Sequence, residues 1–269
     1  MIDVHPPHHA ANTLRDFLIH IATIVVGLLI AIGLEQGVEM LHERHAIHES
    51  HEALQREYEE NAQRVTKETQ FWRRGAAALQ NNLFVLRYLQ QHPGTPEDKL
   101  PGRLFWGLSN EVFAHAAWDS AQQTGIVKLL PQGEATEDAF LYLELQRVEN
   151  ATAEVWLAVN DAEQFNLSEP NPTQLTPTQL TEVINLTEEA LTKQILVGEA
   201  LLNLTGNFPD LPQSVNQGEI NMLRNQTIWK PESPSNDAEK LTAKRMREAY
   251  EGDLPILTPD DSKREDLKK

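Results

Sequence analysis

The strongest constraint in this 269-residue sequence is an uninterrupted apolar run near its amino terminus. Residues 17–34 read FLIHIATIVVGLLIAIGL and contain no Asp, Glu, Lys or Arg. Eighteen residues of α-helix are roughly 27 Å long, close to the roughly 30 Å thickness of a bilayer's hydrocarbon core. The sequence therefore predicts one transmembrane helix over residues 13–34, preceded by a flexible amino terminus at residues 1–12.

Two other kinds of segment produce a similar run, namely a buried helix of a soluble protein and a cleaved signal peptide. The rest of the chain is too polar to offer an obvious core that would surround such a helix on all sides. A signal peptide is the stronger alternative, because Ala31-Ile32-Gly33 has the small-x-small form of a cleavage site. The run is nevertheless longer than the roughly 7–15 apolar residues of a signal peptide. We therefore favour an uncleaved anchor.

The flanks of the span suggest where its helix starts and how it is oriented. Thr13 and Asp16 have the spacing of a capping box, which favours helix initiation at this point. The distribution of basic residues hardly discriminates between orientations, since Arg15 precedes the span and Arg44 follows it. A large body after a first short span favours an amino terminus in the cytoplasm. We expect a location in the cell membrane, with the body outside the cytoplasm.

Small residues form a stripe along the predicted span. Thr23, Gly27 and Ala31 are spaced four residues apart, so they lie on one side of the helix. Such a stripe lets two helices approach closely within lipid, although small residues are also common in membrane helices that pack against nothing. These three residues are our candidate association site, with either a second copy of the chain or another membrane protein as the partner.

Beyond the span, the chain is expected to be all-α, with the membrane helix continuing into a stalk helix over residues 35–92. Apolar residues repeat here every seven positions, first as Met40, Ile47 and Leu54 and then as Tyr58, Val65 and Trp72. Polar residues interrupt both series when they are continued, namely Asn61 and Glu68 in the first and His51 in the second. The pattern predicts half of a coiled-coil seam, packed on one side against the remaining body.

Residues 93–228 are predicted to complete an up-and-down helical bundle. We expect helices at residues 104–114, 116–124, 136–165, 176–206 and 214–225. Thr176, Pro177 and Gln179 form a capping box with proline at the first helical position. The candidate core positions of the 136–165 helix are Phe140, Leu143, Val148, Val155, Val159 and Ala162. Residues 229–269 are expected to be mostly disordered, with a possible short helix at residues 238–250.

A short motif follows the predicted 104–114 helix, where residues 118–126 read WDSAQQTGI. Together with the uncharged span and the helix after it, this segment resembles bacterial membrane-anchored helical proteins of unknown function. The resemblance covers the anchor and the first half of the body, and it implies a fold and an anchor but no activity. On this resemblance, Trp118 is a packing residue and Gly125 is a turn residue.

Histidines are concentrated at the start of the stalk. His42, His45, His48 and His51 recur every third residue, whereas the helical motif of zinc metalloproteases requires two histidines at positions i and i+4. Steps of three residues spiral around a helix, so these side chains do not share one face. A pairwise metal site remains open, such as His45 with Glu49 or His48 with Glu52, if an oligomer completes it. Otherwise the four histidines form a solvated, titratable surface.

Composition limits the remaining classes of function. The chain has no cysteine, which excludes disulfides, thiolate metal sites and cysteine nucleophiles. A formal net charge of −17 argues against nucleic-acid binding. No phosphate-binding glycine loop, dinucleotide fingerprint or serine-hydrolase elbow is present. We therefore expect a non-enzymatic, membrane-tethered module without a cofactor, which acts by self-association or as an accessory subunit. The alternative is a juxtamembrane metal- or pH-responsive sensor.

Overall fold

The computed structural model describes residues 14–168 and 171–225, and it confirms the predicted all-α class. Within these ranges there is no strand, and the α-helices are α1 (Leu14–Gln91), α2 (Ala116–Thr124), α3 (Gln132–Ser168), α4 (Pro177–Asn207) and α5 (Gln217–Asn225). Short 3₁₀ turns occupy Glu97–Lys99, Ile126–Lys128 and Pro172–Gln174. The predicted flexible terminus, the predicted carboxyl-terminal tail and the Thr13 end of the expected capping box lie outside the described residues.

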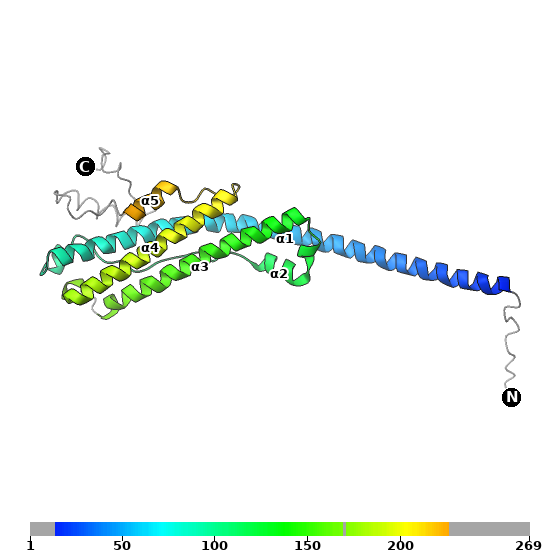
Figure 1. Cartoon of the computed structure of the whole chain (residues 1–269), viewed down its shortest axis with the longest axis horizontal. Coiled ribbons are helices and arrows are strands. Elements are labelled where there is room, and N and C mark those ends of the chain that lie inside the picture. The colour runs from blue at the N-terminus through cyan, green and yellow to red at the C-terminus, as the bar shows by residue number, and fades with distance from the viewer. Residues whose placement is uncertain (1–13, 169–170, 226–269) are drawn as a thin grey trace, which may run out of the picture.

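Helix α1 is continuous over 78 residues and joins the apolar run to the bundle as one rod (Figure 1). The sequence has no proline between Pro7 and Pro93 that would interrupt it. None of the most apolar 18-residue window is buried, so the body does not cover this segment. Partial burial begins at Ala46 and Ile47 and becomes nearly complete at Leu54, whereas Met40 is exposed. The predicted stalk is therefore exposed over residues 35–45 and packs against the body only after them.

The bundle consists of the second half of α1 together with α3 and α4 (Figure 1). Helices α1 and α3 run in the same direction, because the chain between them returns along the bundle, and α4 runs antiparallel to both. Helix α4 packs against both α1 and α3, and α5 covers part of α4. The predicted capping box of α4 is present. The Thr176 side chain accepts the Gln179 N–H at 3.3 Å, and the Gln179 side chain accepts the Thr176 N–H at 2.9 Å. This local signal fixes the start of α4 at Pro177.

The inward face of α3 matches the predicted positions only from Val148 onward. Val148, Val155, Val159 and Ala162 are buried, as expected. The predictions for Phe140 and Leu143 are wrong, because these side chains are 39% and 45% exposed. Tyr142 instead turns inward and stacks on Trp118 of α2, with ring centroids 5.0 Å apart. This stacking sets which side of the first turns of α3 faces the core.

The predicted helix at residues 104–114 is also wrong. Residues 103–115, called here the return segment, contain no helix and run back along the bundle in an extended course (Figure 1). Phe105 is bonded to Asn82 of α1 and Ala114 to Asn61, so nine steps of the segment cover 21 residues of helix. At about 1.5 Å per helical residue this is roughly 3.5 Å per step, the rise of a fully extended chain.

Five buried polar side chains of α1 hold the return segment and its junction with α2. These are Glu57, Asn61, Glu68, Asn81 and Asn82, called here the polar ladder. Asn61 exchanges two hydrogen bonds with the main chain of Ala114, at 2.8 and 2.9 Å. Asn82 does the same with Phe105, at 2.8 Å in both directions. Each asparagine side chain thus pairs with both the N–H and the C=O of one residue of the segment, as the main chain of a neighbouring β-strand would.

Helix α3 binds the return segment from its other side. Glu149 accepts the Phe113 N–H at 2.8 Å, and the Trp156 indole donates to the Asn110 side chain at 3.1 Å. The segment is therefore bonded to α1 and α3 at once. Gly107, Ser109 and Asn110 give it little helical propensity of its own, so these tertiary bonds decide its conformation.

The Glu57 side chain of α1 caps the amino-terminal end of helix α2. The N-cap residue His115 makes no side-chain capping bond, and the Glu57 carboxylate instead accepts the N–H groups of Ala117 and Trp118, at 2.7 and 3.2 Å. Gly125 ends α2 in the left-handed conformation, with φ 78°. Trp118 is thus a packing residue and Gly125 a turn residue, as the sequence resemblance implied.

The hydrogen bonds of the polar ladder predict that Asn61→Ala lowers the free energy of unfolding by more than the loss of side-chain packing alone would. The substitution leaves the Ala114 N–H and C=O without their partner, at a cost of about 1–3 kcal/mol for each buried polar group left unpaired. Chemical denaturation of the full chain in mild detergent measures this loss. Asn61→Leu is the matched control for volume, because it keeps a side chain of similar size and removes both hydrogen-bonding groups. Equal stabilities of all three proteins would contradict the role given to Asn61.

Candidate functional site

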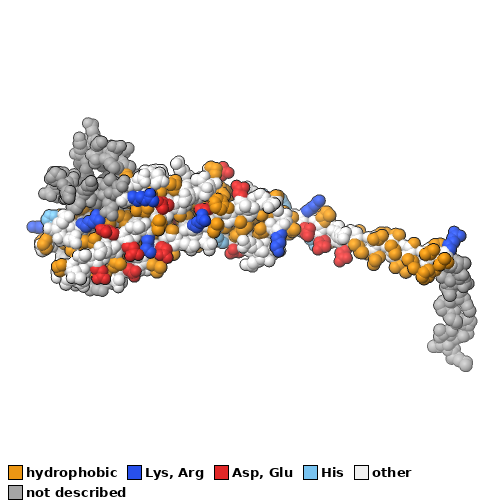
Figure 2. Space-filling view, in the orientation of Figure 1, with side chains coloured by type: hydrophobic (Ala, Val, Ile, Leu, Met, Phe, Trp, Pro, Cys, Tyr) orange, Lys and Arg blue, Asp and Glu red, His pale blue; other side chains and the backbone are white. Residues whose placement is uncertain are grey.

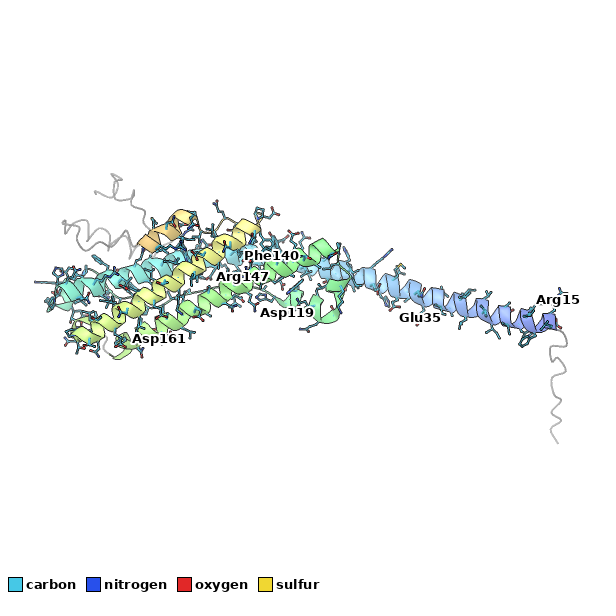
Figure 3. All side chains as sticks on the ribbon, in the orientation of Figure 1. Arg15, Glu35, Asp119, Phe140, Arg147 and Asp161 are labelled. Carbon is cyan, nitrogen blue, oxygen red and sulfur yellow. The ribbon has the colours of Figure 1, made fainter. Side chains whose placement is uncertain are left out.

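The candidate site is the exposed part of α1 that precedes the bundle. Figure 2 shows this arm as a thin rod covered by hydrophobic side chains, with charged groups gathering toward the body. Arg15 and Glu35 lie at the two ends of its uncharged stretch (Figure 3). Helical geometry makes this arm a single rigid surface, since α1 has no break between the apolar run and the first buried residues.

The predicted association residues lie on the uncovered surface of the arm. Thr23, Gly27 and Ala31 are all exposed. The Thr23 hydroxyl donates to the Ile19 carbonyl at 2.9 Å, so its hydrogen-bonding need is met within the helix. A Cβ atom added at Gly27 would meet nothing within 4 Å. The stripe is therefore open to a partner helix. Its role as an association site stays a prediction.

The stalk histidines pair with carboxylates along the helix. His45 Nε2 lies 3.1 Å from Glu49 Oε1, and His48 Nε2 lies 3.3 Å from Glu52 Oε1. These are the two pairs expected from the sequence, and all four side chains are more than half exposed. No group of three or more potential metal ligands occurs in residues 14–168 and 171–225. A pair alone supplies two of the four ligands that a tetrahedral zinc site requires.

The last stalk histidine meets the start of α3. His51 Nε2 lies 3.1 Å from Glu134 Oε1, which joins the stalk to the bundle at the point where α1 enters it. Asp138 is near this contact, and burial together with the charges of Glu134 and Glu137 raises its pKa to about 6. The His51 charge opposes that shift. Acidic groups thus gather at this junction, and the histidine compensates them in part.

A buried network lies just beyond the junction. The Tyr142 hydroxyl donates to Glu57 Oε1 at 2.5 Å, and burial raises the pKa of Tyr142 far above its ordinary value. His115 Nε2 lies 3.3 Å from Glu149 Oε2, and the other oxygen of that carboxylate holds the return segment. Tyr142 therefore remains a hydrogen-bond donor at every physiological pH. The network fixes α2 and the return segment to α1 and α3.

Glu68 is the ladder residue whose protonation changes in the neutral range. Its carboxylate accepts the Glu111 N–H at 2.7 Å and lies 3.2 Å from the Thr152 hydroxyl. Burial raises the pKa of Glu68 from 4.5 to about 7, because two hydrogen bonds do not replace the water that the carboxylate has lost. The side chain borders a gap of about 10 Å³ lined also by Trp72, Gly75 and Gln194.

The apolar pattern of the sequence does not reveal the polar ladder. Asn61 and Glu68 interrupt the apolar series, yet both residues and Asn82 lie at multiples of seven residues from Leu54. That spacing placed them on the buried face of α1. A polar residue on the buried face of a helix indicates that the segment packed against it has main-chain groups that need a hydrogen-bond partner. Gly75 completes the series and lets Gln194 and Leu108 approach the helix closely.

Comparison with known proteins adds no relative: no family profile, no characterised protein and no solved structure matches this chain.

The raised pKa of Glu68 predicts a pH-dependent stability. Because the folded-state pKa lies above the unfolded value, the proton stabilises the folded chain fully below about pH 4.5, and this stabilisation is lost as pH rises through about 7. Glu68→Gln keeps an acceptor for Glu111 and gains a donor for Thr152. The variant should therefore exceed the unsubstituted chain in unfolding free energy by about 1–3 kcal/mol at pH 8 and match it near pH 5.

Urea denaturation at a series of pH values measures this difference. The variant Asp138→Asn, at the start of α3, serves as a comparison, since the pKa of Asp138 is raised in the same direction and predicts a gain of the same sign. Parallel pH profiles for Glu68→Gln and the unsubstituted chain would contradict the account of Glu68.

Proposed function

We propose that this chain is a membrane-tethered helical interaction module, which acts by association and not by catalysis. On this proposal, residues 17–34 cross the cell membrane, the amino terminus is cytoplasmic and the bundle stands outside the cytoplasm. The 20 residues from Leu34 to Leu54 hold the bundle roughly 30 Å above the end of the span. The partner is either a second copy of the chain or a larger membrane assembly.

One observation carries the proposal, namely the complete exposure of the apolar arm. Twelve Phe, Leu, Ile and Val side chains of residues 17–34 are exposed. At about 1.5–3 kcal/mol for each such side chain, covering them is worth on the order of 20–30 kcal/mol. That exceeds the roughly 5–15 kcal/mol by which ordinary domains are stable. A segment of this kind requires a lipid or protein surface, and its length suits the lipid bilayer.

The rigid link between the arm and the bundle favours a role in which the arm positions the bundle, beyond attaching it to the membrane. A flexible linker would let the body take any position, whereas a continuous helix transmits the position and rotation of the span to the bundle. Association of spans would therefore bring bundles together in a defined arrangement. This is the property expected of a scaffold or of an accessory subunit.

A juxtamembrane metal- or pH-responsive role is the second candidate. The His45–Glu49 and His48–Glu52 pairs favour it, because both are exposed and both lie directly above the proposed membrane surface. Calorimetric titration of the full chain in detergent with zinc separates the two candidates. Absence of micromolar binding would remove the metal-responsive version.

The association site predicts that Gly27→Leu combined with Ala31→Leu weakens self-association. Two leucines on the small-residue stripe would hold partner helices apart, and several-fold less of an untagged copy should then co-purify with a tagged one. Ala22→Leu with Val25→Leu is the matched control, since it adds bulk to the opposite side of the span. Equal recovery for both double variants would count against the stripe. Recovery of a stoichiometric foreign protein instead of a second copy would indicate an accessory subunit.

A further inference from the structure

We infer that a second copy of this chain packs in parallel along the stalk, on a seam that continues out of the membrane to the histidines. This inference rests on the self-associating form of the proposed function and names its interface. The seam runs through Ile24, Gly27, Ala31, Leu34, Val38 and Leu41, which alternate at intervals of three and four residues. All six are exposed in the single chain.

The part of the seam beyond the span carries the inference. Val38 and Leu41 are 54% and 64% exposed, and Leu34 at the membrane boundary is 67% exposed. On the proposed membrane placement, lipid does not cover Val38 or Leu41. A small-residue stripe within lipid would not account for them, whereas a helix packed alongside α1 would bury all three.

The bundle of the same chain cannot be what covers this seam. The face that the bundle buries begins with Ile47 and Leu54, whereas the seam continues through His48 to Gln55. The two series differ by one residue, which is about 100° around a helix. Glu52, Gln55 and Glu59 keep the seam side exposed next to the body, so a second copy has room to approach.

The residue types favour two parallel strands. A shared membrane orientation makes any pairing of two copies parallel. In heptad terms, the β-branched Ile24 and Val38 occupy a positions, and Leu34 and Leu41 occupy d positions. This is the combination that favours a two-stranded parallel coiled coil. A second copy brings the same a and d residues to the other side of the seam, so it is the occupant that these residue types favour.

Charges beside the seam are complementary in the same register. Arg44 occupies a g position and Glu49 the following e position, so in a parallel pair Arg44 of each copy faces Glu49 of the other. His45 and His48 take the next a and d positions. Polar side chains at such positions fix the register of a coiled coil at a cost in stability. The histidines thus mark the upper end of the seam, immediately before α1 enters its own bundle.

Single-cysteine cross-linking tests the seam directly, because the chain contains no cysteine of its own. Val38→Cys and Leu41→Cys place thiols on the seam, and Gln36→Cys and Glu43→Cys place them on the opposite side of the same turns. In a parallel pair, like residues of the seam come close enough for a disulfide, whose Cα atoms lie about 4.4–6.8 Å apart. After mild oxidation in membranes, we expect several-fold more covalent dimer for the two seam variants.

Equal cross-linking at all four positions, or none at the seam, would overturn the inference. Co-purification of differently tagged copies distinguishes a failure of this seam from a failure of the proposed self-association. If tagged copies still co-purify, only this seam is wrong; if they do not, self-association is wrong as well. A charge reversal tests the register separately. Arg44→Glu should reduce cross-linking through Leu41→Cys, and adding Glu49→Arg should restore it.

Discussion

The hydrogen bonding of the return segment by buried side chains of α1 is the interaction on which the body depends. An extended segment without a neighbouring strand would leave its main-chain groups unpaired in the core, which is costly. Asn61 and Asn82 answer that need by pairing with both main-chain groups of one residue each, while Glu57 and Glu68 accept further N–H groups. The segment can therefore lie between two helices and complete a bundle that three long helices alone would not fill.

The same helix serves two surfaces that face different ways. From Leu54 onward, the buried side of α1 organises the bundle of its own chain. Before that point, the seam that includes Val38 and Leu41 faces outward and is left exposed by the described part of the chain. Because α1 is continuous, the two surfaces keep a fixed rotation relative to each other. Pairing of the outer surfaces would consequently set the distance and orientation between two bundles.

Local signals in the sequence predicted those features that local forces determine. The capping residues of α4, the glycine that ends α2 and the long apolar run each specify their own structure, and the structure agrees with them. The return segment could not be predicted in this way, because its conformation depends on Asn61, Glu68 and Asn82, which lie 20 to 60 residues earlier in the chain. Phe140 and Leu143 were misplaced for a similar reason, since the stacking of Trp118 on Tyr142 decides which face of α3 turns inward. Of the candidate site, the sequence predicted the exposed stripe and the two histidine–glutamate pairs, but not the junction of His51 with Glu134.

The central claim is that the exposed arm associates with a second copy within the membrane. Its most direct test is the native mass of the full-length protein extracted with its surrounding lipid, without prior exposure to detergent. The account predicts a particle that contains two copies, with a protein mass twice the 30.4 kDa of one chain. A particle with one copy, alone or with a different protein, would contradict it.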